Sequence, residues 1–240
     1  MSSLQTLIFY ATPEHDCSYL EGKQATTMFV DPKANIDTAL YSKLSVLGFR
    51  RSGNHYYRPH CNACNACIPV RLPVNEFKPS RNQKRNIKKN LGLEITTTPP
   101  DFYQKHYDLY EKYIIARHAD GDMYPPSEEQ YRSFLVESNP NTFFVEFKYK
   151  GELIGVSVVD ELTDGLSSVY TYFDPDIAER SLGVYSILWQ IEECKRRSLS
   201  HLYLGYWIKN CRKMEYKTLY KPLEYLINNN WLREEPTKTI

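Results

Sequence analysis

The feature that most constrains the fold of this 240-residue chain is a change of hydrophobic periodicity at residue 141. Three successive segments then show the alternating, β-branched and aromatic pattern of strands. These segments are Thr142–Lys148, Glu152–Glu161 and Leu166–Phe173. The turn dipeptides Lys150-Gly151 and Asp164-Gly165 separate them, which predicts an antiparallel meander. Residues 183–197 follow with apolar positions at i, i+3, i+4 and i+7, and Leu202–Trp207 reads as a further strand, so a helix and a strand complete the unit.

A meander that leads into a strand–helix–strand unit has the element order of the acyltransferase fold whose members acetylate amines. In that fold a glycine turn opens the helix and its backbone N–H groups hold a phosphate. The corresponding piece here, Arg180-Ser-Leu-Gly183-Val-Tyr185, ends in a tyrosine that suits a pyrophosphate poorly, so ordinary coenzyme A is not the expected donor. We predict an α+β fold: a GNAT-like acyltransferase domain over residues 81–240, with a mixed, mainly antiparallel sheet flanked by helices, and a small Cys-rich N-terminal domain over residues 1–80.

Local signals predict the elements of the first 140 residues. Leu4–Ala11 reads as a strand, and Phe49–Pro73 reads as a loop because it is rich in Cys, Arg and Asn. Side chains that cap helix N-termini precede four other segments. They are Asp37, Ser80 with Gln83 as its capping-box partner, Asp101, and Ser127 with Gln130. Gly48 and Gly92 mark the ends of the first two predicted helices.

Charge is distributed unevenly along the chain. Between Thr38 and Leu93 there are 11 Lys and Arg residues against one acid, Glu76, whereas the remainder holds 19 basic and 28 acidic residues. The densest part is the predicted helix that begins after Ser80. A solvated helix face is the plain alternative, but tyrosines and histidines in the same block suit base stacking beside phosphate contacts. We therefore expect this region to bind a nucleic acid.

The cysteines form the sharpest local pattern. Cys61, Cys64 and Cys67 follow one another at C-x-x-C spacing, and Cys17 is a candidate fourth member. Thiolates at this spacing can share one metal ion, and four of them complete a zinc site or hold an iron–sulfur cluster. Reduced structural thiols are the alternative. Cys194 and Cys211 are expected to be packing thiols.

Composition excludes several classes of protein. Hydrophobic residues make up 42% and charged residues 25%, which is ordinary for a globular protein. No run approaches the roughly 18 apolar residues of a membrane helix, and the start of the chain lacks a secretion signal, so a cytoplasmic location is expected. Walker-loop, HExxH and nucleophile motifs are missing from the sequence, which disfavours hydrolase and nucleoside-triphosphatase functions.

Taken together, the motifs resemble those of the arginyl/leucyl-tRNA–protein transferase family. They are spread over almost the whole chain. The stretches that carry the resemblance are Cys17-Ser-Tyr-Leu, Gly48-Phe-Arg-Arg-Ser-Gly53, Tyr57-Arg-Pro-His-Cys-Asn-Ala-Cys64, Ala66-Cys-Ile-Pro-Val-Arg71, Phe77-Lys-Pro-Ser-Arg81, Arg117-His118, Gly121-Asp-Met123, Asp164-Gly-Leu-Ser-Ser-Val-Tyr-Thr-Tyr-Phe-Asp-Pro175, Arg180-Ser-Leu-Gly183, Gly205-Tyr-Trp-Ile208, Cys211, Lys213-Met214 and Tyr216-Lys217.

The resemblance implies transfer of an aminoacyl group, leucyl in the bacterial subgroup, from tRNA to a protein that begins with Asp or Glu, which marks it for degradation by the N-end rule. The implied partners are Leu-tRNA and such proteins, and neither a membrane nor DNA is expected. An aminoacyl ester is already activated, so no cofactor is required beyond aminoacyl-tRNA as co-substrate. Larger relatives are thought to hold an iron–sulfur cluster, but at a different cysteine spacing. The residues expected to contact tRNA are Lys84, Arg85, Lys88, Lys89, Lys213 and Lys217.

Candidate site residues follow from what the reaction needs. Asp174, at the end of a strand, is expected to orient the attacking amine, and Tyr170 and Tyr172 are expected to line the site together because they share one strand face. Core packing is the alternative for both tyrosines. An acidic acceptor needs a cation, for which arginine offers a two-pronged donor. The arginines near the cysteines are Arg50, Arg51, Arg58 and Arg71.

Three other functions remain open at this point. Arginine transfer by the same mechanism is one, because nothing in these residues distinguishes the two donors. A coenzyme A-dependent amine acetyltransferase and a non-catalytic RNA-binding module with a metal knuckle are the others.

Overall fold

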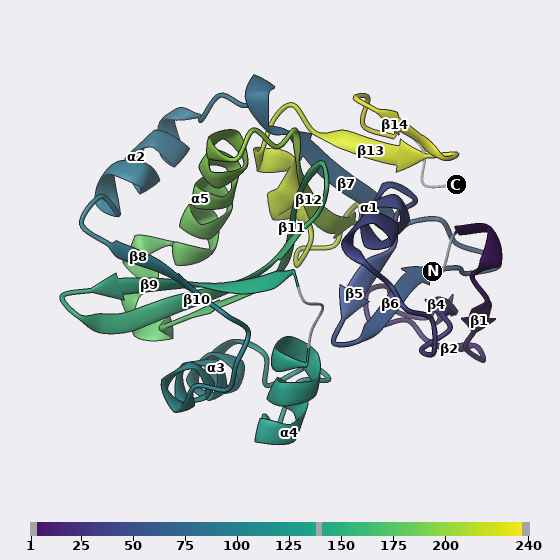
Figure 1. Cartoon of the computed structure of the whole chain (residues 1–240), viewed down its shortest axis with the longest axis horizontal. Coiled ribbons are helices and arrows are strands. Elements are labelled where there is room, and N and C mark those ends of the chain that lie inside the picture. Colours follow the sequence, from purple (N-terminus) through teal and green to yellow (C-terminus); the bar gives the residue numbers. More distant parts are fainter. Residues whose placement is uncertain (1–3, 138–140, 237–240) are drawn as a thin grey trace.

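The computed structural model describes residues 4–137 and 141–236, and its centre is a large mixed sheet. Across this sheet the strands run in the order β14-β13-β7-β12-β11-β10-β9-β8. Strands β11 and β12 are parallel, whereas the other paired neighbours are antiparallel. This arrangement shows the predicted α+β class with a mixed, mainly antiparallel sheet (Figure 1).

The strands of the sheet come from both halves of the chain. They are β7 (Ile68–Pro73), β8 (Glu94–Thr98), β9 (Thr142–Tyr149), β10 (Glu152–Glu161), β11 (Gly165–Phe173), β12 (His201–Trp207), β13 (Glu224–Ile227) and β14 (Asn230–Leu232). The predicted meander is therefore confirmed as β9–β10–β11, and the predicted final strand is β12. Strands β8, β13 and β14 were not predicted, because short strands without clear alternation give little local signal.

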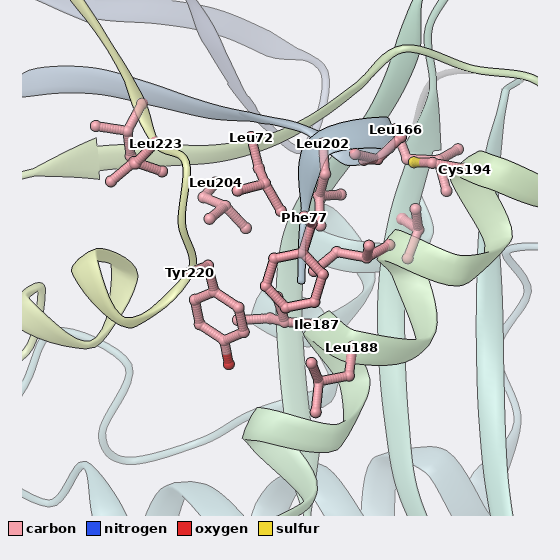
Figure 2. Close-up of a cluster of buried hydrophobic side chains, with 14 of the residues drawn as sticks. Leu72, Phe77, Leu166, Ile187, Leu188, Cys194, Leu202, Leu204, Tyr220 and Leu223 are labelled. Atoms are coloured by element: carbon pink, nitrogen blue, oxygen red, sulfur yellow. The ribbon is translucent and has the colours of Figure 1, made fainter. Parts of the chain in front are cut away.

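Helices cover both faces of the sheet (Figure 1). Helices α5 (Leu182–Arg196) and α2 (Arg81–Lys89) lie on one face, above a core that includes Leu72, Ile187 and Leu202 (Figure 2). The buried Cys194 is part of this core, as expected of a packing thiol. The opposite face carries α3 (Gln104–Arg117), α4 (Glu128–Tyr131) and a π-helical turn, η3 (Arg132–Val136), over a tyrosine-rich core.

Residues 4–67 form a smaller lobe beside the sheet (Figure 1). Its sheet has the order β1-β4-β6-β5, and a separate hairpin pairs β2 with β3. The elements are η1 (Leu4–Thr6), β1 (Phe9–Ala11), β2 (His15–Asp16), β3 (Gln24–Ala25), β4 (Thr27–Val30), α1 (Thr38–Val46), β5 (Arg50–Ser52) and β6 (His55–Pro59). The apolar core of this lobe includes Tyr203 of β12 and Leu162, so the lobe packs directly on the large sheet.

The helix caps behave largely as the sequence predicts. The Asp37 side chain accepts from the Leu40 N–H, and Ser80 and Gln83 form the reciprocal capping box. Ser127 caps α4 through the Gln130 N–H. Asp101 does not cap α3, which begins after Tyr103. The remaining short helices are η2 (Val74–Glu76), η4 (Pro175–Arg180) and η5 (Glu215–Leu219).

Two predictions for the N-terminal part are wrong in detail. Phe49–Pro73 is not a loop, because it contains β5, β6 and β7. The predicted strand Leu4–Ala11 is a 3-10 turn followed by the short strand β1. Strand β7 pairs with β12 and β13 inside the large sheet, although the sequence places it in the Cys-rich N-terminal domain. A separate Cys-rich domain is therefore not confirmed.

Within the described ranges, none of the helices is both long and apolar enough to cross a bilayer.

Candidate active site

Strands β11 and β12 form an opening in the middle of the sheet. Their parallel pairing covers only Gly165–Ser167 against His201–Tyr203, although β11 continues to Phe173 and β12 to Trp207. Directly after this paired stretch, between Tyr203 and Gly205, the register of β12 against β7 shifts, and Gly205 has φ +80°. The two strands diverge beyond this point, so backbone groups that would otherwise pair across the sheet are free for other partners.

Arg50 of β5 occupies this opening. Its Nη1 donates to Ser167 Oγ at 2.8 Å, and its Nη2 donates to the Ser168 carbonyl oxygen, which takes the place of a ladder hydrogen bond. A Cβ built on Gly205 would lie 3.3 Å from Arg50 Nε and 3.5 Å from its Cζ. Gly205 thus allows both the positive φ and the close approach of the guanidinium to the strand.

Aromatic residues and one lysine surround the Arg50 guanidinium. Its charge opposes the burial that raises the pKa of Tyr57, Tyr206 and Tyr216, so all three phenols lie within its field. Lys217 of η5 is only 4% exposed, and its Nζ donates to the Tyr206 carbonyl oxygen and to Met214 Sδ. Burial, followed by the Arg50 charge, lowers the Lys217 pKa to about 7.

The three predicted catalytic residues have different surroundings. Tyr172 is fully buried, and its hydroxyl is hydrogen-bonded to that of Tyr131, which matches the core-packing alternative. Tyr170 shares its face of β11, but its buried hydroxyl has no hydrogen-bond partner in the described part of the chain. Asp174 caps η4 and accepts from Lys112 Nζ at 2.6 Å. Burial raises the Asp174 pKa, but the hydrogen bond and charge of Lys112 and the Asp176 N–H together outweigh it, so the Asp174 pKa is lowered.

The other predicted acceptor arginines have internal partners away from this opening. Arg51 is buried and forms a two-pronged ion pair with Asp160. Arg58 donates to the Leu47 carbonyl oxygen and lies over the Phe49 ring.

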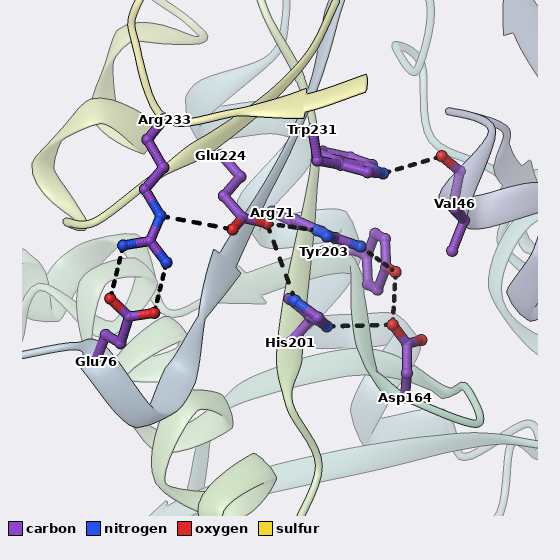
Figure 3. Close-up of polar contacts among 9 residues, drawn as sticks. All are labelled: Val46, Arg71, Glu76, Asp164, His201, Tyr203, Glu224, Trp231 and Arg233. Atoms are coloured by element: carbon purple, nitrogen blue, oxygen red, sulfur yellow. Dashed lines mark hydrogen bonds and ion pairs between the residues drawn. The ribbon is translucent and has the colours of Figure 1, made fainter. Parts of the chain in front are cut away.

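Arg71 is held in a network on the side of β7 that faces the C-terminal hairpin. It donates to Glu224 at 2.8 Å and stacks 4.3 Å from the centroid of the Trp231 ring (Figure 3). The Trp231 indole in turn donates to the Val46 carbonyl oxygen of the N-terminal lobe (Figure 3). Among the four predicted arginines, Arg50 is therefore the one seated in the sheet opening.

The predicted tRNA-contacting cations are split by the fold. Lys84, Arg85, Lys88 and Lys89 lie exposed on α2, as a phosphate-binding surface requires. Lys213 is also exposed and pairs with Asp120 at 3.4 Å. Lys217, by contrast, is buried beside Arg50, where a phosphate backbone cannot reach it. The sequence-based assignment of Lys217 to the tRNA surface therefore disagrees with its position.

Comparison with known proteins shows the family to which the chain belongs. Residues 105–227 match the family model for the C terminus of arginine-tRNA-protein transferase, and residues 15–85 match the model for its N terminus. The chain belongs to the arginine-tRNA-protein transferase family. It is accordingly an aminoacyltransferase. A Marinobacter nauticus relative named aspartate/glutamate leucyltransferase is 59% identical over 96% of this chain and 98% of its own length, and a Hahella chejuensis relative of the same name is 56% identical over 97% and 99%.

Two solved structures match this chain at much lower sequence identity than these relatives do. FemX has a TM-score of 0.47 at 7% identity, with 88% of this chain and 82% of that chain covered. A ribosomal-protein-alanine N-acetyltransferase from Brucella melitensis has a TM-score of 0.36 at 13% identity, with 52% and 87% covered. Likeness at this level carries no argument about the function of the transferase.

The cysteines of this transferase gather around one position. Burial, together with the nearby thiols of Cys17, Cys61, Cys64 and Cys211, raises the Cys67 pKa to about 12. The five thiols are therefore near one another, including Cys17, which the fold has to bring in from the far end of the lobe. The described residues nevertheless contain no group of three or more His, Cys, Asp or Glu side chains placed to hold a metal ion. The arrangement of the described residues therefore does not support the predicted zinc or iron–sulfur site.

Some residues of the candidate site were not predicted. They include Tyr216, whose pKa is raised by burial, lowered by the nearby Arg50 charge and raised again by Tyr113, so Tyr216 lies near both residues. Gly205 was noted only as part of a motif. Its isolated position inside a strand pattern was a usable signal, since such glycines often mark bulges or close backbone approach.

Proposed function

We propose that this transferase moves leucine from Leu-tRNA to the N-terminal Asp or Glu of acceptor proteins, which creates a degradation signal. The observation that carries the proposal is the near full-length identity of 54–59% to proteins named aspartate/glutamate leucyltransferase. The position of Arg50 supports it, because an acidic acceptor side chain needs a cation held beside the reacting centre.

The reaction needs positioning and proton transfer more than activation. The neutral α-amine of the acceptor attacks the ester carbonyl carbon, a C–N bond forms, and the C–O bond to the ribose breaks. One amine proton leaves and the ribose oxygen gains one, so no other reactant is consumed. An α-amine has a pKa of roughly 7.7–8.0, so a weak base or a water relay is sufficient. Arg50 binds the acidic side chain in this scheme, and the unpartnered Tyr170 hydroxyl faces the developing oxyanion.

Asp174 is our candidate for orienting the amine. Its carboxylate stays ionised beside Lys112, so it can accept hydrogen bonds from the attacking amine. The exposed cations of α2 bind the tRNA backbone in this proposal. We further propose that residues 81–240 form a GNAT-like aminoacyltransferase domain beside the N-terminal residues 1–80, and that the enzyme acts in the cytoplasm.

A peptide assay tests both substrates at once. The enzyme is incubated with Leu-tRNA or Arg-tRNA and with peptides that differ only in their first residue, and the products are read by mass spectrometry. We expect a leucyl mass increment on Asp- and Glu-initiated peptides and none on the matched Ala-initiated peptide. An arginyl increment would refute the leucyl assignment, equal yields on all peptides would refute acidic recognition, and acetylation by acetyl-coenzyme A alone would favour the acetyltransferase alternative.

A further inference from the structure

A cavity of about 560 Å³ lies at the end of β12, and the proposed mechanism does not use it. This volume is within the range of roughly 300–1,000 Å³ that small-molecule sites occupy. Its lining combines two aromatic rings, two cations and two carboxylates. These residues are Trp207, Tyr216, Lys209, Arg212, Glu215 and Glu235. Neither Lys209 nor Arg212 forms an ion pair with another residue that the structure describes, so both remain available to an anionic ligand.

The chemistry of this lining matches the three parts of a nucleotide. An exposed aromatic ring can stack on a base, and Tyr216 is 44% exposed, whereas Trp207 is only 3% exposed and belongs to the core beneath the cavity. Arginine and lysine bind phosphate. Carboxylates accept hydrogen bonds from ribose hydroxyls, as they do in dinucleotide sites. An acidic peptide would use the two cations but would leave the two carboxylates facing its own charge.

The rim of the cavity is joined to the basic helix α2. Leu219 lines the cavity, and its carbonyl oxygen accepts a hydrogen bond of 3.1 Å from Gln83 Nε2 of α2. The cations Lys84, Arg85, Lys88 and Lys89 of this helix are exposed, and Lys89 also donates to the Glu179 carbonyl oxygen. The N-terminal end of α2 therefore lies beside the rim of the cavity.

The inner side of the cavity adjoins the opening between β11 and β12. Tyr216 belongs to the cavity lining and lies in the field of Arg50, which occupies the opening. Lys217, the next residue, is packed against Tyr206 behind it. A nucleoside in the cavity would thus stand next to the position proposed for the acceptor.

From these contacts we infer that the cavity at the end of β12 binds the 3′-terminal nucleotide of the donor tRNA, with Arg212 and Lys209 on its phosphate and Tyr216 on its base. This inference rests on the proposed function. It assigns the donor end to the cavity and the acceptor to the Arg50 side of the opening.

The unacylated trinucleotide CCA, the 3′ end of tRNA, is the probe that separates this cavity from α2. It is added to the wild-type enzyme, to the variant Lys209→Ala/Arg212→Ala, and to a charge-matched control, Lys33→Ala/Lys150→Ala, whose side chains are exposed elsewhere. We expect CCA to compete with Leu-tRNA and not with the acceptor peptide. Its inhibition constant should rise about tenfold in the cavity variant, as expected for loss of a charged hydrogen bond, and should not change in the control.

The α2 variant Lys84→Ala/Arg85→Ala/Lys88→Ala/Lys89→Ala should bind CCA normally, because the trinucleotide is too short to use that helix. Competition of CCA with the peptide, an unchanged inhibition constant in the cavity variant, or no CCA inhibition at millimolar concentration would each overturn the inference. If the wild-type enzyme transfers no leucine, the proposed function fails separately, and direct titration of CCA into the same three proteins still decides whether the cavity binds it.

Discussion

At the residue scale, Arg50 differs from the other three predicted arginines because it alone among them lies in the opening of the large sheet. Arg50 is fastened to Ser167 and Ser168 on β11 and lies against Gly205 on β12, so both strands define its position. Arg51, its neighbour in the sequence, points to the opposite side of β5 and is neutralised by Asp160. Successive side chains of a strand point to opposite faces, which explains why these two adjacent arginines have different partners.

We expect Arg50→Gln to reduce kcat/KM for an Asp-initiated peptide by about 100-fold, because the acceptor carboxylate would lose its charged partner. The KM for Leu-tRNA should change little. Steady-state kinetics with the peptide and the tRNA varied separately measure this. Arg58→Gln, which alters an arginine held on β6, is the matched control and should stay close to wild type. Equal losses in the two variants would argue against a specific role for Arg50.

At the element scale, α2 docks on the protein through amides in place of an apolar stripe. Gln83, Asn86 and Asn90 follow one another at i, i+3 and i+7 on its buried side. Asn86 Nδ2 donates to the Arg180 carbonyl oxygen at 3.0 Å, and Asn90 Nδ2 donates to the same oxygen at 3.0 Å. These hydrogen bonds hold the polar helix α2 in a defined position beside α5. The cations of α2 lie on its remaining, exposed faces.

Replacing Lys84, Arg85, Lys88 and Lys89 together by Ala should weaken tRNA binding for every tRNA sequence. The slope of log affinity against log salt should fall in magnitude by about 3, because fewer counterions are released. Filter binding over a range of salt concentrations measures both effects. A charge-preserving variant, Lys84→Arg/Lys88→Arg/Lys89→Arg, should bind as the wild type does. If the alanine variant kept its affinity and slope, the helix would be only a solvated surface.

At the scale of the whole molecule, buried polar contacts join the N-terminal lobe to the large sheet. Asp160 of β10 accepts both prongs of Arg51 and hydrogen bonds from the hydroxyls of Tyr41 and Thr142. On the other side, Arg71, Glu224 and Trp231 connect β7, the C-terminal hairpin and Val46 (Figure 3). Arg50 is on β5 of the N-terminal lobe, whereas the opening that it occupies lies between β11 and β12 of the large sheet. The contacts between lobe and sheet therefore also fix the position of Arg50 in the site.

We expect Arg51→Met to destabilise the protein by about 3–5 kcal/mol, because it leaves the Asp160 carboxylate buried without its cation. Adding Asp160→Asn should recover part of the loss, since the amide can still bond to Tyr41 and Thr142 without an unpaired charge. Urea unfolding followed by circular dichroism gives the four stabilities of this cycle. A mild single variant, or a double variant no more stable than Arg51→Met, would contradict this account of the link.

The sequence alone determined the parts of this protein that depend on local chemistry. The meander from Thr142 to Phe173, the cap of α1 at Asp37 and the capping box at Ser80 were predictable because strand alternation, turn residues and caps act between neighbours in the chain. The spread of family motifs likewise identified the transferase. Only the tertiary structure decided that β7 joins the large sheet, that Arg50 and not Arg51 occupies its opening, and that Lys217 is buried. The physical reason is that burial and charge pairing depend on partners more than 100 residues away, such as Asp160 for Arg51 and Ser167 for Arg50, and no local pattern records those partners.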